Sequence, residues 1–276
     1  MRNLIVASIV AIVVISFFAL NKKPELSLTK ITVSGSSTIA PLVSVIAKIY
    51  ESNNPDVRID VQSGGSSRGI ADTRSGLSDI GLVSRSLNKD EQDLIAHKIA
   101  MDGISLILNK ENPVGELTHQ QIVDIYTGVI SNWKEIGGKD EAITVVNKAE
   151  GRSTLELFQA FFGVKGSQIQ ADIVIGENEQ GIKAVAGNPG AIGYVSIGSA
   201  EFSRNQGVPI KLLPLDGVSA STASLRSGEF PISRPLNLVT SKSPSEEVKK
   251  FIAFAQSSVV RGSVEAQYFV PAGGSQ

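Results

Sequence analysis

The chain contains no cysteine among its 276 residues and only two histidines, His97 and His119. Without thiols it can form no disulfide bond, thiolate metal site, cysteine nucleophile or lipid link through cysteine. A hydrolase needs a base beside its nucleophile. We interpret His97 as part of a charged helical stretch and His119 as the neighbour of a helix cap, and we expect both to be solvated. The sequence has no His/Asp/Glu cluster with metal-ligand spacing. It therefore predicts a protein that is not an enzyme, with no catalytic residue, metal or cofactor.

The chain also lacks an excess of charge of either sign. It has 26 Lys and Arg residues against 27 Asp and Glu residues, a formal net charge of −1. No global positive field is available to attract nucleic acid or an acidic membrane surface. We predict no nucleic-acid partner, and any recognition of an anion must come from a local site.

Long apolar runs are missing except near the N-terminus, where Leu4–Leu20 is almost unbroken and is followed by Asn21 and two lysines. The length of this run lies between that of a signal-peptide core and that of a membrane span, and no small-x-small cleavage motif precedes Asn21. Residues 1–27 are therefore predicted to be a signal peptide or an uncleaved anchor in the inner membrane, formed by a hydrophobic helix at residues 4–20. The remainder is expected on the periplasmic, extracytoplasmic side.

Strands rich in isoleucine and valine alternate with helical patterns, which predicts an α/β fold. Apolar residues recur at helical spacing over residues 39–50. Two pairs, Thr118 with Gln121 and Ser243 with Glu246, fit capping boxes at helix starts. The expected strands are Thr29–Ser34, Val57–Val61, Asp79–Ser84, Gly103–Asn109, Ala142–Lys148, Asp172–Gly176, Ala191–Ser196 and Leu236–Thr240.

A second α/β segment interrupts the middle of this pattern, which suggests two lobes with a ligand cleft between them. We assign residues 28–108 and 232–276 to lobe 1 and residues 109–231 to lobe 2. The chain is expected to cross between the lobes near Leu108–Glu111 and again near Leu213–Arg234. The last helical stretch is expected to run from Pro244 to about Gln267.

Three loops rich in glycine, serine and threonine connect strands to helices: Ser34–Thr38, Ser63–Gly69 and Glu150–Thr154. The N-terminus of a helix presents unpaired backbone N–H groups and the positive end of the helix dipole, so it suits a tetrahedral anion. Any single loop is explained equally well by helix caps and turns. Three loops of one composition predict a shared anion site at the carboxyl ends of the strands.

Two arginines occur in such turns: Arg85 directly after a strand and Arg152 inside the third loop. A guanidinium can bind two oxygens of an oxyanion at once. Each arginine could instead form a surface ion pair, but their shared location favours ligand contact. Asp79 is the nearest carboxylate in sequence, and it could equally be a structural cap or an arginine partner.

From about Ile31 to Pro271 the chain resembles the substrate-binding protein of the bacterial phosphate ABC transporter. The motifs that carry the resemblance are Ser34–Thr38, Gly65–Ile70, Asp79–Gly81 with Ser84 and Arg85, Asp102–Ile104, Asn132 and Trp133, Gly151–Thr154, Gly190–Tyr194 and Arg234–Leu236.

The resemblance implies a two-lobed type II periplasmic-binding-protein fold that closes over a dehydrated anion. It further implies phosphate binding for delivery to an ABC permease in the cytoplasmic membrane, by a monomer. Thr38, Ser66, Ser84 and Thr154 match ligand positions of the family. The full set of expected phosphate-binding residues is Ser37, Thr38, Ser66, Ser84, Arg85, Arg152, Ser153 and Thr154.

The chain departs from the family pattern at two places. Many members have an arginine four residues before a Ser-Gly-Thr triplet, where this chain has Lys148 before Arg152-Ser153-Thr154. Some members carry a carboxylate that accepts the proton of hydrogen phosphate, where this chain has Ser84. These departures leave two alternatives open: a membrane-tethered oxyanion-binding module for sensing or adhesion, or a receptor for another oxyanion such as sulfate or tungstate.

Overall fold

The computed structural model describes residues 28–273. The predicted N-terminal hydrophobic helix lies outside this range. Within the range, no helix is both long enough and apolar enough to cross a membrane. The strands form one mixed ten-stranded sheet in the order β2-β1-β3-β9-β4-β7-β5-β6, with β8 and β10 paired to β4. The fold is α/β, as predicted.

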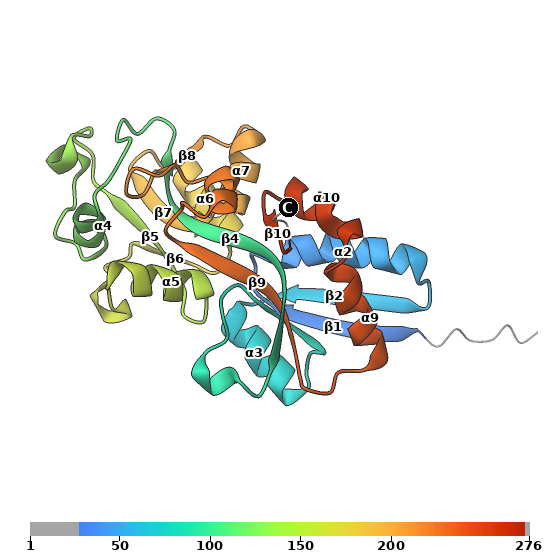
Figure 1. Ribbon diagram of the computed structural model, residues 1–276. Helices are drawn as coiled ribbons and strands as arrows, with labels where there is room; N and C mark the ends of the chain where they lie inside the picture. Colours follow the sequence, from blue (N-terminus) through green and yellow to red (C-terminus); the bar gives the residue numbers. More distant parts are fainter. Residues whose placement is uncertain (1–27, 274–276) are drawn as a thin grey trace, which may run out of the picture.

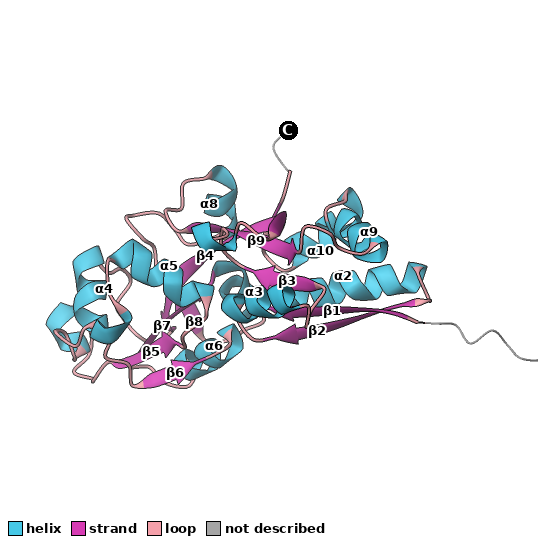
Figure 2. Ribbon diagram, turned by 90° about the horizontal axis from the view of Figure 1, so that it is seen from below, coloured by secondary structure: helices cyan, strands magenta, loops and turns pink. Residues whose placement is uncertain are grey.

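Strands and helices alternate along most of the chain (Figures 1 and 2). The strands are β1 (Thr29–Gly35), β2 (Val57–Ser63), β3 (Ile80–Val83), β4 (Ile95–Asn109), β5 (Thr144–Lys148), β6 (Ile173–Ile175), β7 (Ala191–Ser196), β8 (Ile210–Leu212), β9 (Ser233–Thr240) and β10 (Val270–Pro271). The α-helices are α2 (Ala40–Asn53), α3 (Ser66–Ser75), α4 (His119–Tyr126), α5 (Ser153–Phe162), α6 (Asn178–Ala186), α7 (Ile197–Asn205), α8 (Thr222–Ser227), α9 (Glu246–Ala255) and α10 (Arg261–Ala266). Short 3-10 helices are η1 (Lys89–Glu91), η2 (Trp133–Ile136), η3 (Gly166–Gln168) and η4 (Ser258–Val260).

The long strand β4 connects two parts of the molecule, and β9 runs antiparallel beside its first part (Figure 1). Gly103 pairs with Ser233 of β9, whereas the next residue, Ile104, pairs with Ser196 of β7. The change of partner therefore falls at residues 103 and 104. We call the part built on β1, β2, β3, β9 and the start of β4 the β1 side. The part built on the end of β4, β5, β6, β7 and β8 is the β7 side.

On the β1 side, helices cover both faces of the sheet. One face packs Ile31, Val33 and Leu236 against apolar residues of α2, α9 and α10. The other face packs Val83 and Val239 against α3 through Ile70. Because helices cover both faces of the sheet, the sequences of these strands are nearly continuous apolar runs.

The β7 side is built in the same way around the end of β4. Ile104, Leu106 and Leu108 face a core with Phe158 and Tyr194. Ile107 points to the opposite face, into a core formed with α6, α7 and β8. This alternation is the two-residue period of a strand.

The structure corrects several local predictions. β4 begins at Ile95, so His97 lies in a strand and not on a helix, and its Nε2 is 3.1 Å from Thr240 Oγ1. The last helical stretch is divided into α9, η4 and α10, and the cap of α9 is Ser245 rather than Ser243 because the Ser245 hydroxyl accepts the Val248 N–H. The short strands β8 and β10 were not predicted. The capping box of Thr118 and Gln121 is confirmed.

We predict that Phe251→Ala lowers the free energy of unfolding by about 3–5 kcal/mol, because Phe251 is fully buried between α9 and the sheet and its removal leaves a cavity. Phe202→Ala is the matched control, since Phe202 is 39% exposed, and it should cost about 1 kcal/mol or less. Chemical denaturation monitored by circular dichroism measures both. Equal losses for the two variants would contradict this account of the core.

Candidate functional site

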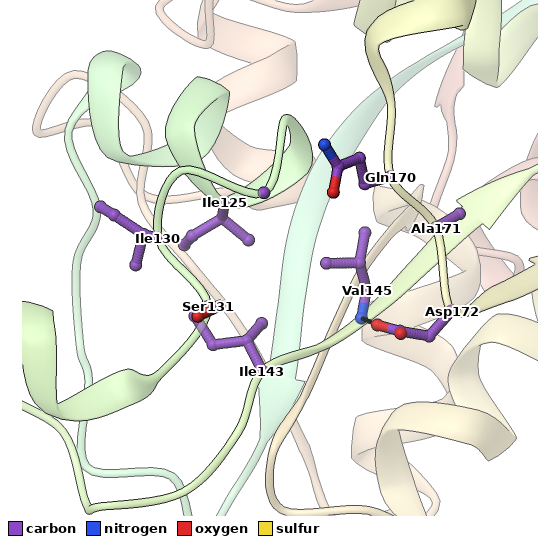
Figure 3. Close-up of a pocket in the computed structure, with 9 residues that line it drawn as sticks. Ile125, Ile130, Ser131, Ile143, Val145, Gln170, Ala171 and Asp172 are labelled. Atoms are coloured by element: carbon purple, nitrogen blue, oxygen red, sulfur yellow. Dashed lines mark hydrogen bonds between the residues drawn. The ribbon is translucent and has the colours of Figure 1, made fainter.

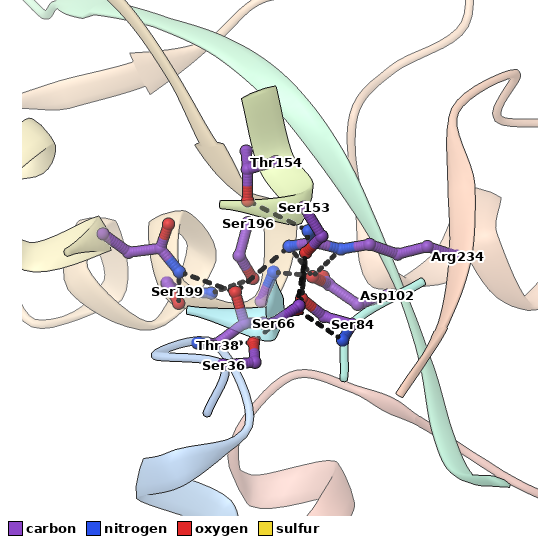
Figure 4. Close-up of polar contacts among 12 residues, drawn as sticks. Ser36, Thr38, Ser66, Ser84, Asp102, Ser153, Thr154, Ser196, Ser199 and Arg234 are labelled. Atoms are coloured by element: carbon purple, nitrogen blue, oxygen red, sulfur yellow. Dashed lines mark hydrogen bonds and ion pairs between the residues drawn. The ribbon is translucent and has the colours of Figure 1, made fainter. Parts of the chain in front are cut away.

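Six buried hydroxyl groups from distant segments meet where the β1 side faces the β7 side (Figure 4). We call them the hydroxyl cluster; its members are Ser36, Thr38, Ser66, Ser84, Ser153 and Thr154. The Ser66 hydroxyl donates to Ser153 Oγ at 3.1 Å, and the Oγ atoms of Ser84 and Ser153 are 2.5 Å apart. Ser36 Oγ donates to Ser84 Oγ at 2.8 Å. Side chains of loops 87 residues apart in sequence thus touch directly.

The cluster lies at helix starts, as the three loops predicted. α3 begins at Ser66, α5 begins at Ser153, and α2 begins two residues after Thr38. The first backbone N–H groups of a helix have no partner within it and carry the positive end of the dipole. Two further helices begin here, α6 at Asn178 and α7 after its cap Ser196.

Gly65 is required for the close approach of two of these helix starts. Its φ of 97° lies in the region that favours glycine, and a Cβ atom there would meet Gly151 O at 2.7 Å. The Ser67 N–H donates to that same carbonyl at 3.3 Å. The glycine therefore lets the start of α3 lie against the loop that precedes α5.

Arg234 lies at the centre of the site, although the sequence analysis did not include it among the ligands. Its side chain is 1% exposed and pairs with Asp102, whose Oδ2 is 2.9 Å from Nη2 and 3.2 Å from Nε. The other N–H groups of the guanidinium donate to Thr154 Oγ1 at 3.0 Å and to Thr38 Oγ1 at 3.2 Å. One arginine thereby contacts hydroxyls from both sides of the molecule.

Asp102 and Arg234 face each other because they are register partners on the neighbouring strands β4 and β9. Asp102 is fully buried, and its Oδ1 accepts the N–H of Gly198. Held by these partners, the carboxylate in turn holds the guanidinium in one orientation. In the sequence, Asp102 is an acidic residue next to an apolar strand, and Arg234 shortly precedes another apolar strand. The sequence analysis noted both residues only as parts of family motifs.

A second cation, Lys148, lies at the end of β5 and is 2% exposed. Its ammonium donates to Asn178 Oδ1 at 2.9 Å, and Asn178 Nδ2 donates to Thr38 Oγ1 at 3.0 Å. Burial, and secondarily the nearby Arg234, lower the pKa of Lys148 from its ordinary value to about 7. Lys148 thus reaches the cluster through one amide side chain.

The two arginines chosen from the sequence do not join the cluster. Arg85 binds both carboxylate oxygens of Glu91 at 2.7 and 2.9 Å, and its Nε is 2.6 Å from Glu156. Arg85 is therefore held by these carboxylates, whereas the preceding residue, Ser84, bonds to the cluster. Arg152, the residue before α5, pairs with Glu177 at 3.0 Å.

Two other residues from the sequence analysis also lie outside the cluster. Ser37 lines a pocket of about 430 Å³ beside the starts of α2 and α6. Asp79 is exposed and accepts the backbone N–H and the hydroxyl of Thr32, so it is a structural cap.

A separate pocket of about 240 Å³ lies on the β7 side (Figure 3). It is lined by Ile125, Ile130, Ile143 and Val145, and its carboxylate, Asp172, accepts the N–H of Val145. Ser131 and Gln170 also line the pocket, but none of its lining residues is a cation that could bind an oxyanion.

The chemistry of the cluster is that of an anion receptor. Hydroxyls, helix starts and a guanidinium are donors, and its one carboxylate is already engaged by Arg234. Among residues 28–273 no group of three or more His, Asp or Glu side chains could hold a metal ion. His119 packs with a tilted ring against Phe161 and Phe162 of α5, and His97 lies in β4 beside Thr240, so neither histidine adjoins a cluster hydroxyl.

Comparison with known proteins agrees with this chemistry. A family profile described as PBP superfamily domain matches residues 22–259. The phosphate-binding protein PstS of Bacillus subtilis is 30% identical over 255 residues, which cover 91% of this chain and 83% of that protein. The PstS protein of Borreliella burgdorferi is 28% identical over 250 residues, covering 87% of this chain and 89% of that protein.

Solved structures share the fold. A Clostridium perfringens protein, crystallised with bound phosphate and provisionally named a phosphate ABC transporter substrate-binding protein, superposes with a TM-score of 0.82 at 33% identity, covering 88% of this chain and 100% of that one. An ABC-type phosphate transport receptor from Vibrio cholerae gives a TM-score of 0.71 at 29% identity, with the same coverage. The chain therefore has a mixed α/β periplasmic-binding-protein-like fold and belongs to the PBP superfamily, in the family of the PstS phosphate-binding proteins.

Proposed function

We propose that this chain captures inorganic phosphate outside the cytoplasm and delivers it to an ABC permease of the cytoplasmic membrane. The observation that carries the proposal is the Arg234 guanidinium, fixed by Asp102 and directed at hydroxyls from both sides of the molecule. The names of the relatives support phosphate as the ligand, and the family consists of binding proteins and not of enzymes. The apolar run at residues 4–20 supports export, either as a periplasmic protein or as one anchored to the inner membrane.

Capture is proposed to occur by closure of two lobes. The β1 side contributes Thr38, Ser66 and Ser84, and the β7 side contributes Ser153 and Thr154. The strands β4 and β9 connect the sides, so a small rotation about residues 103–104 and 232–233 would open the cluster to solvent. Arg234 lies beside this hinge and would keep its place on Asp102 in both positions.

Binding requires the anion to exchange its hydration shell for protein donors. The cluster hydroxyls, the first N–H groups of α3 and α5, and Arg234 supply those donors at fixed positions. Bonds from ionised or dipolar donors to an oxyanion are stronger than bonds between neutral groups. Donors held in place by folding lose little further entropy on binding.

The cluster is rich in donors and poor in acceptors, which bears on the choice of anion. A buried acceptor for the ligand's proton is what rejects an anion without one. Asp102 is engaged by Arg234 and by the N–H of Gly198, and the Ser84 hydroxyl is bonded to other hydroxyls of the cluster. We therefore propose only modest rejection of sulfate.

Isothermal titration of the purified chain, freed of bound anion, tests the function. Phosphate and arsenate should bind with micromolar or tighter affinity, and sulfate should bind more weakly. A preference for sulfate or tungstate would favour a receptor for that oxyanion. Failure of all these anions to bind would contradict the proposal.

Arg234→Lys should weaken phosphate binding by more than tenfold, a loss of about 1.4 kcal/mol or more. A lysine cannot contact Asp102, Thr38 and Thr154 together as the planar guanidinium does. Arg152→Lys is the matched comparison and should change affinity less than threefold, because Arg152 pairs with Glu177 at the edge of the site. Titration calorimetry measures both. The reverse ranking would restore Arg152 as the ligand and remove Arg234.

A further inference from the structure

Lys148 is a cation of the site that forms no ion pair with a carboxylate of residues 28–273. Its ammonium can donate three hydrogen bonds, yet within residues 28–273 its one hydrogen-bond partner is Asn178 Oδ1. The two neighbouring cations are each paired, Arg234 with Asp102 at 2.9 Å and Arg152 with Glu177 at 3.0 Å. The pairs cancel in formal charge, so the proton on Lys148 decides whether the centre of the site is neutral or positive.

The groups around Lys148 do not fix its protonation. Arg234 and Arg152 disfavour the ammonium, whereas Glu177 favours it. The Tyr194 hydroxyl accepts the backbone N–H of Lys148 at 3.4 Å. Burial is the largest influence, and together these influences hold the pKa of Lys148 at about 7.

Asn178 connects this lysine to the hydroxyl cluster. An ammonium has no acceptor, so the amide oxygen must face Lys148 and the amide N–H₂ must face Thr38. Thr38 Oγ1 then accepts from Asn178 at 3.0 Å and from Arg234 at 3.2 Å. With both lone pairs engaged, the Thr38 hydroxyl is left to donate its own proton. A protonated Lys148 thereby favours Thr38 as a donor.

We propose that phosphate capture at the hydroxyl cluster is coupled to protonation of Lys148, which supplies the positive charge that the Asp102–Arg234 pair does not. This rests on the proposed function. The lone pair of Lys148 Nζ takes a proton from solvent, and phosphate keeps its own protons. The ammonium then stabilises the buried anion directly through its charge and indirectly through Asn178 and Thr38.

The direction of the pH dependence follows from linkage. A bound anion raises the pKa of Lys148 above the value of about 7 that burial and the neighbouring charges give it in this structure. At pH values between the free and bound pKa, binding takes up a proton, so affinity falls as pH rises. At pH values below the pKa of Lys148 without bound anion, the lysine is already charged, so anion binding takes up few protons. The fall should approach about tenfold for each pH unit above neutrality.

Calorimetric titration of the full chain with inorganic phosphate, at about pH 8.5 in buffers of different ionisation enthalpy, counts the protons taken up. Free phosphate is already the dianion there. Wild type should take up close to one proton per phosphate bound. Lys148→Arg, permanently charged, should bind phosphate with almost no proton uptake and with affinity nearly constant between about pH 8 and 9.

Lys211→Arg is the matched control, because Lys211 is also partly buried but donates to Asn112 O on the β7 side, away from the cluster. It should take up protons as wild type does. The ¹³C shift of Lys148 Cε in wild type gives a second measurement that needs no variant, and at about pH 8.5 it should move to the ammonium value on adding phosphate.

Phosphate binding without proton uptake would overturn the coupling and leave the proposed function standing. Proton uptake that persists in Lys148→Arg would mean that another group takes up the proton. This result would also overturn the proposed coupling. Absence of phosphate binding by wild type would remove the proposed function and this inference together.

Discussion

The organisation of the site depends on the buried ion pair between Asp102 and Arg234. The two residues are partners on β4 and β9, the strands that join the two sides of the molecule. A buried charge without its partner costs several kcal/mol, so each residue holds the other in place. Because Asp102 occupies Nε and one edge of the guanidinium, the remaining N–H groups point at the hydroxyls of Thr38, Thr154 and Ser84. The pair thereby gives the hydroxyls of both sides a common centre.

The hydroxyl cluster follows from the same requirement that buried polar groups be satisfied. Ser36, Ser66, Ser84 and Ser153 are all nearly inaccessible and bond to one another. A hydroxyl both donates and accepts, so the same groups that satisfy one another can turn their protons toward an anion. Helices that begin at Ser66 and Ser153 add backbone donors at no further cost in ordering, since the fold already fixes them.

The charges of the site differ in how they are compensated, and this decides their roles. Arg85 and Arg152 are each bound by glutamate side chains and contribute to the structure around the cluster. Arg234 is compensated by Asp102 and directs its remaining N–H groups at hydroxyls of the cluster. Within the described part of the chain, Lys148 has an amide as its partner and no carboxylate, so its charge is the one that we propose a ligand changes.

The sequence by itself determined the α/β fold, the anion chemistry and the loops at helix starts, because each depends on short-range patterns: strand and helix periodicity, glycine in turns, and hydroxyls before helices. It therefore identified Thr38, Ser66, Ser84, Ser153 and Thr154, which the structure brings into one cluster. Only the tertiary structure decided which arginine lies among them. Asp102 and Arg234 are 132 residues apart and meet through strand pairing. Arg85 and Arg152 are held outside the cluster by glutamate side chains. These ion pairs form only in the folded chain, because ion pairing depends on distances in space that the local sequence does not contain.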